Sequence, residues 1–254
     1  MKSHHILLFM LVSGLPVKAF AGVSLAQPLE DADSLLSDAP TPSGWFAPLR
    51  TTVDVGIDSQ RFFKGFNLAD DPWLWTQIDL MTYPFHVYAM IGEADNGYDE
   101  LNVGAGYFLD LAENVKLRLG FEWDHYGQGD FFFENNYVNV NTLFYETPLG
   151  RASAEWAYDW KFNGDMFRVG FTTKPFPLTD RLAVMADANL CYDVGWFGAP
   201  FEGRNNVDVT LSVPFKINEH CSLTGFLRYN EPLAAIDFIE DQALSGGGTL
   251  RFEF

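Results

Sequence analysis

Basic side chains are scarce in this sequence. Its 254 residues include 16 Lys and Arg against 34 Asp and Glu, which gives a net charge of −18. Proteins that bind nucleic acid carry a basic patch or stripe that neutralises phosphates. The acidic balance therefore argues against a nucleic-acid partner.

Long apolar runs are missing as well. The run Ile6–Val12 is too short for the ~20 residues that a spanning helix needs, and no later stretch reaches about 18. This run follows the charged Lys2 and precedes the small-x-small sequence Ala19–Ala21, a pattern typical of a secretory signal peptide. We expect a signal peptide over 1–21, cleaved near Ala21, an acidic irregular leader over 22–48, and a single barrel over 49–254.

Histidine is also rare, which limits enzymatic chemistry. Beyond the expected cleavage site the only histidines are His86, His125 and His220. A hydrolytic triad needs Ser, His and an acid within hydrogen-bond reach, and the neighbours Asp124 and His125 are the only suggestive pair. We expect no enzyme and no cofactor. The acidic loop residues lack the spacing of a calcium loop, so no metal site is expected either.

Strict alternation of apolar and polar residues is what the sequence has in abundance, together with an aromatic content of 16%. In Val115–Asp124 every odd position is large and apolar, and every even position is charged or glycine. Only a β-strand places alternate residues on opposite faces. One face of this segment therefore suits lipid and the other suits water.

About twelve segments of this kind follow one another, and their links alternate between short and long. Short turns at one end and longer loops at the other are typical of outer-membrane barrels. The sequence predicts an all-β fold, a transmembrane up-and-down antiparallel β-barrel of about 12 strands in the bacterial outer membrane. A soluble lipocalin-like barrel or β-sandwich would leave rows of charges outside. The expected strand centres are residues 54, 77, 88, 105, 119, 140, 156, 170, 187, 211, 226 and 250.

Aromatic residues cluster at the ends of these segments, as in the two interfacial girdles of a membrane barrel. The assignment also separates Cys191 from Cys221 beyond disulfide reach. The girdle expected on the loop side comprises Trp73, Trp75, Trp123, Tyr126 and Trp160, and the girdle on the turn side comprises Tyr83, Phe85, Tyr145, Phe176 and Phe215.

Two short motifs resemble known sequences. The stretch Ser59–Gly65 resembles the S-x-Y-x-F-R-G motif of the TorF-type family of suspected outer-membrane porins: Ser59, Phe63 and Gly65 match, Lys64 replaces Arg, and Arg61 departs from Tyr. The resemblance implies a small outer-membrane barrel with pore activity and names no substrate. The ending Thr249–Phe254 resembles the terminal signal read by the barrel-assembly machinery, which makes that machinery and outer-membrane lipid the expected partners.

The polar face of the expected strands would line the lumen. Strand geometry predicts three charge pairs on this face: Asp159 with Arg168, Arg251 with Asp54, and Glu253 with Arg50. The expected lumen-lining residues are Arg50, Asp54, Lys116, Arg118, Glu122, Asp124, Arg151, Glu155, Asp159, Arg168, Asp187, Asp208, Arg228, Arg251 and Glu253.

These observations favour passive diffusion of small polar solutes or ions, with a modest cation preference because of the net acidity. Two alternatives stay open: a structural or adhesive barrel with a filled lumen, and an outer-membrane hydrolase. The 230–246 loop carries apolar residues among acids. It could fold into the lumen as a constriction or cap an external partner site.

Overall fold

The computed structural model describes residues 48–63, 66–127, 135–196, 202–236 and 240–254. The expected signal peptide and nearly all of the expected leader lie outside this part, as do Lys64 and Gly65 of the resemblance motif. Among the described residues, no helix has the length and apolar character needed to cross a membrane.

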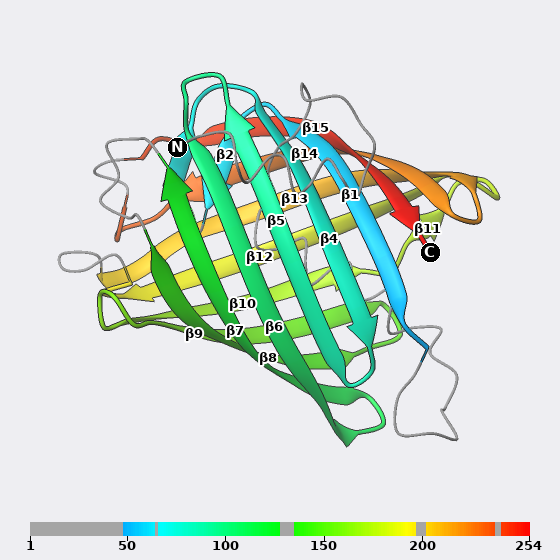
Figure 1. The fold of residues 1–254 in the computed structure, drawn as a ribbon, viewed down its shortest axis with the longest axis horizontal. Helices are drawn as coiled ribbons and strands as arrows, with labels where there is room; N and C mark the ends of the chain where they lie inside the picture. The colour runs from blue at the N-terminus through cyan, green and yellow to red at the C-terminus, as the bar shows by residue number, and fades with distance from the viewer. Residues whose placement is uncertain (1–47, 64–65, 128–134, 197–201, 237–239) are drawn as a thin grey trace.

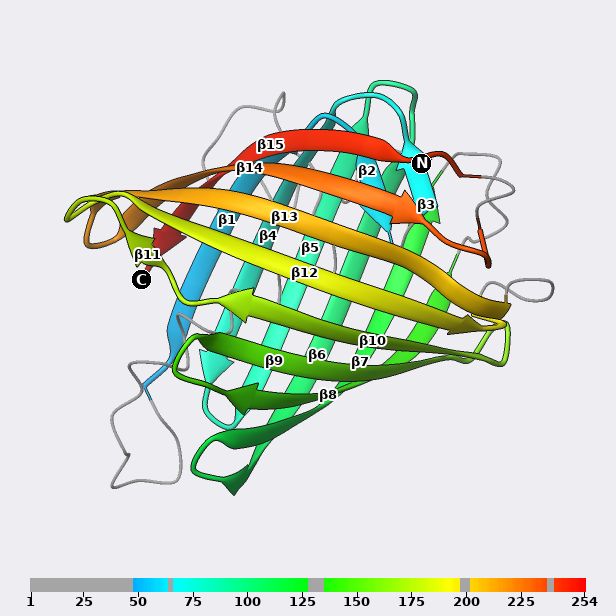
Figure 2. The same ribbon diagram turned by 180° about the vertical axis from the view of Figure 1, so that it is seen from behind.

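Twelve long antiparallel strands of the described chain form a closed barrel, as the alternation predicts (Figures 1 and 2). Each of the twelve expected centres falls inside one of these strands. Their bounds are β1 Arg50–Asp58, β4 Trp73–Thr82, β5 Phe85–Ala94, β6 Asp99–Ala112, β7 Val115–Gly127, β8 Asn136–Glu146, β9 Gly150–Asp159, β10 Gly164–Thr173, β12 Ala183–Val194, β13 Glu202–Asn218, β14 Cys221–Pro232 and β15 Ala243–Glu253. The short β11 (Phe176–Pro177) pairs only with β12.

Closure of the ring removes the open strand edges that lipid cannot satisfy. Sequence neighbours pair around the ring, and β1 also pairs with β15 in the register Asp54↔Arg251. On the far side β10 pairs with β12, in the register Arg168↔Cys191. All these pairings are antiparallel, which gives the up-and-down topology expected from the sequence.

The alternation separates an apolar outer face from a polar inner face. On β7, Leu119 and Phe121 are 44% and 47% exposed, whereas Arg118 and Glu122 are 5% and 3% exposed. A soluble barrel would show the reverse, because its apolar face would be buried inside. The outward rows are thus built to contact an apolar medium.

A second sheet, which the sequence reading did not anticipate, lies in the link between β1 and β4. Strands β2 (Arg61–Phe63) and β3 (Phe66–Ala69) form a two-stranded hairpin there. The link runs at the end of the barrel that carries the longer connections (Figure 2). Ser59, at its start, receives a hydrogen bond from the backbone N–H of Gly246 to its Oγ at 3.0 Å.

The loop-side girdle is wrong in part, because Trp73 and Trp75 point into the barrel. Their exposed fractions are 0% and 1%, and Tyr126 packs against the same buried cluster. The indole of Trp75 lies over Gly56, where a Cβ would come within 2.2 Å of the ring. The expected girdle residue Trp160 is 59% exposed.

On the turn side Phe85, Tyr145 and Phe176 are 44%, 49% and 68% exposed, consistent with an outer girdle. Tyr83 instead packs partly against a buried cluster. The two cysteines form no disulfide with each other. Cys191 lies opposite Arg168, toward the loop end of β12, whereas Cys221 is the first residue of β14, beside a short turn. The two cysteines are therefore far apart along the barrel axis, as expected.

Candidate functional site

The polar inner face of the barrel is the candidate functional site. All fifteen residues expected in the lumen lie on this face. Each is an even number of positions away from a buried residue of its own strand, so the two side chains lie on the same side of the sheet. Asp54, Asp124 and Asp159 are at most 1% exposed, whereas Lys116 and Asp208 are partly exposed. Whether the whole set lines a passage stays a prediction.

One expected charge pair is present at the seam between the first and last strands. Arg251 donates from Nε to Asp54 Oδ1 at 2.9 Å and from Nη2 to Asp54 Oδ2 at 2.8 Å. The two bonds between Arg251 and Asp54 fix both side chains more firmly than a single bond would.

Glu253 lies opposite Thr52 in the register, so Arg50 is its diagonal neighbour on the same face.

The pairing of Asp159 with Arg168 is wrong. The hairpin register places Arg168 opposite Glu155, and Arg168 Nη2 donates to Glu155 Oε2 at 3.0 Å. Asp159 lies opposite Gly164, at the turn, where its Oδ1 accepts the backbone N–H groups of Lys161 and Phe162 at 2.7 and 3.0 Å.

Further polar pairs tie neighbouring strands together across the inner face. Arg151 pairs with Glu146, and Lys116 Nζ lies 3.9 Å from Asp110 Oδ1. On the other side of the ring, Thr172 donates to Asp187 Oδ2 at 2.8 Å. The inner face thus carries a network of opposed charges and hydroxyls between its buried apolar clusters.

Asp124 and His125, the suggestive pair for catalysis, point to opposite faces. Asp124 is 1% exposed on the inner face, whereas His125 lies on the outer face with its Nδ1 3.2 Å from Asn135 Oδ1. A histidine–aspartate contact does exist elsewhere. His86 Nε2 lies 2.8 Å from Asp79 Oδ1 across the β4–β5 hairpin, a contact that a search within one strand missed.

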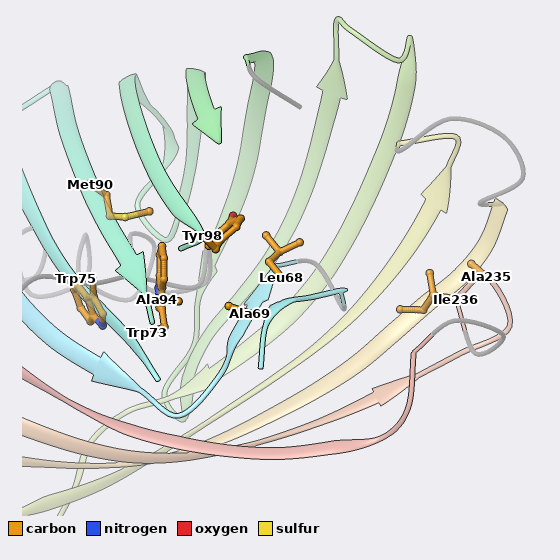
Figure 3. Close-up of a cluster of buried hydrophobic side chains, with 9 residues drawn as sticks. All are labelled: Leu68, Ala69, Trp73, Trp75, Met90, Ala94, Tyr98, Ala235 and Ile236. Carbon is orange, nitrogen blue, oxygen red and sulfur yellow. The ribbon is translucent and has the colours of Figure 1, made fainter. Parts of the chain in front are cut away.

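The loop end of the interior is narrowed by two inward-folded segments. Leu68 and Ala69 of the β2–β3 hairpin and Ala235 and Ile236 after β14 belong to one buried cluster with wall residues (Figure 3). Ile236 is 0% exposed. The wall residues of this cluster are Trp73, Trp75, Met90, Ala94 and Tyr98.

A buried ion pair fastens the hairpin to the wall. Arg61 donates to Glu100 from Nε at 3.0 Å and from Nη2 at 2.7 Å, and the Tyr98 hydroxyl donates to the same carboxylate at 3.1 Å. The guanidinium also lies 5.5 Å from the ring of Trp73. Sequence reasoning missed both Arg61 and Glu100, although Arg61 is the position that departs from the TorF-type motif.

Glu240 lies beside the segment of Ala235 and Ile236, and its backbone N–H donates to the Ile236 carbonyl at 3.0 Å. Burial, together with the charges of Asp70 and Asp241, raises the pKa of Glu240 to about 7, although a backbone hydrogen bond from Asn67 lowers it. Asn67 lies in β3 of the hairpin, and Asp70 directly follows that strand. The two inward segments are therefore coupled electrostatically as well as by packing.

In the part of the chain that the structure describes, no group of three or more His, Cys, Asp or Glu side chains is placed to hold a metal ion. The closed antiparallel ring with an apolar outer face and a polar inner face defines the transmembrane β-barrel class of fold.

Solved outer-membrane porins share this fold. A KdgM porin in complex with disordered oligogalacturonate aligns with a TM-score of 0.55 and 11% identity, over 80% of this chain and 99% of that one. A NanC porin structure aligns with a TM-score of 0.52 and 10% identity, over 80% and 98%. At this identity the likeness shows the fold alone. No family model and no curated protein matches the sequence.

Proposed function

We propose that the protein is a porin-type channel of the bacterial outer membrane, which lets small polar solutes or ions diffuse passively. The observation that carries this proposal is the inverted distribution of side chains. Leu119 and Phe121 face outward, and the ion pairs Asp54–Arg251 and Glu155–Arg168 face inward. An apolar exterior suits lipid, and an interior of opposed charges suits water and polar solutes.

The channel is narrow at its loop end in this conformation. The β2–β3 hairpin and the segment around Ile236 occupy that end, fastened by Arg61 and Glu100. A ring of twelve strands lies between eight-stranded barrels, which side chains fill, and sixteen-stranded porins, which leave an aqueous channel. We therefore expect small, discrete conductance steps and not the large conductance of a wide porin.

Membrane targeting and assembly belong to the same proposal. A signal peptide cleaved near Ala21 would deliver the chain, and the barrel-assembly machinery would read the last strand. In support, Phe254 is 76% exposed next to β15, the strand that closes the ring. Membership of the TorF-type family rests on the short motif from Ser59 to Gly65.

Planar-bilayer recording tests the proposal. The purified protein, shown to be folded by its heat-dependent gel mobility, should give stepwise conductance, and removal of residues 233–242 should enlarge the steps. A folded barrel that conducts neither with nor without this segment would overturn the channel.

A structural barrel with a filled lumen is the second candidate. It is favoured by the low exposure of the inner side chains, such as Thr142 at 0% and Asn102 at 2%. The same recording distinguishes the two, because a filled barrel stays silent even after the loop-end segment is removed. Binding of cells or surfaces by the loops would then be the activity to test.

A further inference from the structure

Two asparagines, Asn139 and Asn141, lie on the outer face of β8, between two exposed tyrosines of the same strand. Tyr137 and Tyr145 are 50% and 49% exposed, and the residues of this face alternate with buried inner residues. The tyrosines are about 26 Å apart along the strand at about 3.3 Å per residue, a length comparable with the apolar band of outer-membrane barrels. Asn141 lies midway between them, so both carboxamides face the middle of the band.

The neighbouring strands offer these carboxamides apolar side chains. Strands β7, β8 and β9 lie side by side in the wall (Figures 1 and 2). Asn141 lies opposite Leu119 of β7 and Trp156 of β9. Asn139 lies opposite Phe121 of β7. Within the part of the chain that the structure describes, no hydrogen bond joins either carboxamide to another residue.

Other polar groups on this part of the outer face are satisfied by the chain itself. Trp156 Nε1 donates to Asp165 Oδ1 at 2.6 Å, and the Tyr158 hydroxyl donates to Asn163 Oδ1. A carboxamide that faces hydrocarbon without a hydrogen-bond partner is costly. The two asparagines of β8 therefore suit a surface that another polar group covers.

We propose that this outer face of β7, β8 and β9 is the interface with a second copy of the chain, in which Asn139 and Asn141 of the two copies hydrogen-bond to each other. A carboxamide carries two N–H donors and a carbonyl acceptor, so it is complementary to a copy of itself. Side-chain hydrogen bonds of this kind join separate segments within membranes. Such an interface requires only that the barrel lie in a membrane, whether or not it conducts.

Membrane geometry favours a two-fold dimer. Two copies inserted in the same orientation are related by an axis along the membrane normal, so residues of equal depth meet. On a two-fold axis a patch meets its own equivalent, which places the asparagine pair of one copy against that of the other. A ring of three or more copies would bring the patch against a different face, and no other Asn or Gln lies in the middle of the outer face of the described strands.

Large apolar side chains surround the two asparagines and supply the packing area. Leu119, Phe121 and Trp156 are 44%, 47% and 41% exposed. The ring of Phe121 stacks on that of Tyr137 with their centroids 6.2 Å apart. Apolar neighbours that exclude water lower the local dielectric constant and strengthen the hydrogen bonds that they enclose. The central amides would therefore contribute specificity, and the surrounding rings contact area.

Sedimentation equilibrium of the full chain in detergent micelles tests the interface. We expect the wild type to dimerise, and the dissociation constant of the dimer to rise at least tenfold in Asn139→Leu/Asn141→Leu. Asn139→Gln/Asn141→Gln keeps the carboxamides and should weaken the dimer less. Val53→Leu/Val55→Leu is the matched control on the outer face of β1, across the ring, and should dimerise as the wild type does. Heat-dependent gel mobility shows whether each variant is folded, and leucine suits lipid at these positions.

Disulfide trapping in vesicles of phosphatidylethanolamine and phosphatidylglycerol is the second measurement. Asn141→Cys/Cys221→Ser should form a cross-linked dimer on oxidation. Val55→Cys/Cys221→Ser carries its thiol on the far wall and should stay monomeric under the same conditions. Cys191 is buried in both variants.

A folded wild type that stays monomeric in micelles and vesicles would overturn the interface. The same holds if native mass spectrometry finds a bound lipid or another protein in place of the second copy. A dimer that is equally stable in the leucine variant, or that cross-links through position 55 and not 141, would also contradict it. A monomer that conducts overturns the dimer alone, and a dimer that stays silent overturns the channel alone.

Discussion

Asp54 in the first strand and Arg251 in the last are joined by two hydrogen bonds, at 2.9 and 2.8 Å, across the seam that closes the barrel. The Asp54 side chain is fully buried. Removal of one partner leaves a buried charge without its counter-charge, which typically costs about 3 kcal/mol or more.

We therefore expect Asp54→Asn and Arg251→Gln each to destabilise the folded barrel by about 3 kcal/mol, measured by urea titration of its heat-dependent gel mobility. Lys116→Gln is the control, because its partner Asp110 is 56% exposed and the pair is 3.9 Å apart. If the seam variants unfold no earlier than this control, the pair does not stabilise closure.

The Arg61–Glu100 pair should control the loop end of the lumen. Glu100→Gln weakens the fastening of the β2–β3 hairpin without touching the wall register, so single-channel conductance should increase and open events should lengthen. Glu93→Gln, an exposed change on the adjacent strand, should leave both unchanged. Unaltered conductance in Glu100→Gln would show that the hairpin does not restrict flow.

Glu240 should make the docking of its loop depend on pH. Its pKa is about 7 in the folded protein against 4.5 ordinarily, chiefly because of burial. Between these two values the docked loop binds more protons than the released loop. The contribution of Glu240 to docking is therefore fully present below about pH 4.5 and is lost as the pH rises through about 7.

We expect conductance to rise between pH 5 and pH 8, with the larger part of the change near neutrality. Glu240→Gln stays uncharged and should show the low-pH behaviour throughout. Asp180→Asn, in a turn between β11 and β12, serves as the matched acidic control. A pH profile that is identical in Glu240→Gln and the wild type would contradict this role.

Ion selectivity should reflect the acidic balance. With a net charge of −18, the channel should show a modest cation preference, measured as the reversal potential in a potassium chloride gradient. Arg118→Gln removes a buried positive charge from the inner face and should increase that preference. A clear anion preference in the wild type would contradict the expectation.

The strands were predictable because alternation is a local property. Val115–Asp124 alternates without exception, and its outer and inner faces follow from residue type alone. The closure of the barrel could also be predicted from the sequence. An even number of strands makes the first and last strands antiparallel, and this predicts the contact between Asp54 and Arg251.

The register of a hairpin is harder to predict from the sequence, because it depends on the residue at which the turn begins. A turn of four residues after Asp159 places that residue opposite Gly164 and moves Arg168 to Glu155. Since side chains alternate with a period of two, such a displacement changes the partner of every residue in the strand.

The wrong direction of Trp73 and Trp75 has another cause. Both faces of β4 are largely apolar at its start, and the aromatic residues were assigned to the girdle by their place at a strand end. Further along the strand Gln77 and Asp79 share the face of the two indoles, so alternation over the whole of β4 indicates the inner face, where Leu68 and Ala69 pack against them.

The pairing of β1 with β15 also has a kinetic meaning. Asp54 and Arg251, which are in contact, are 197 positions apart in the sequence. Long-range contacts of this kind slow folding, because the entropy of loop closure is lost before they form. Until residue 253 is in place, β1 and β14 each keep an open hydrogen-bonding edge, which makes the last strand the step that converts an aggregation-prone sheet into a finished wall.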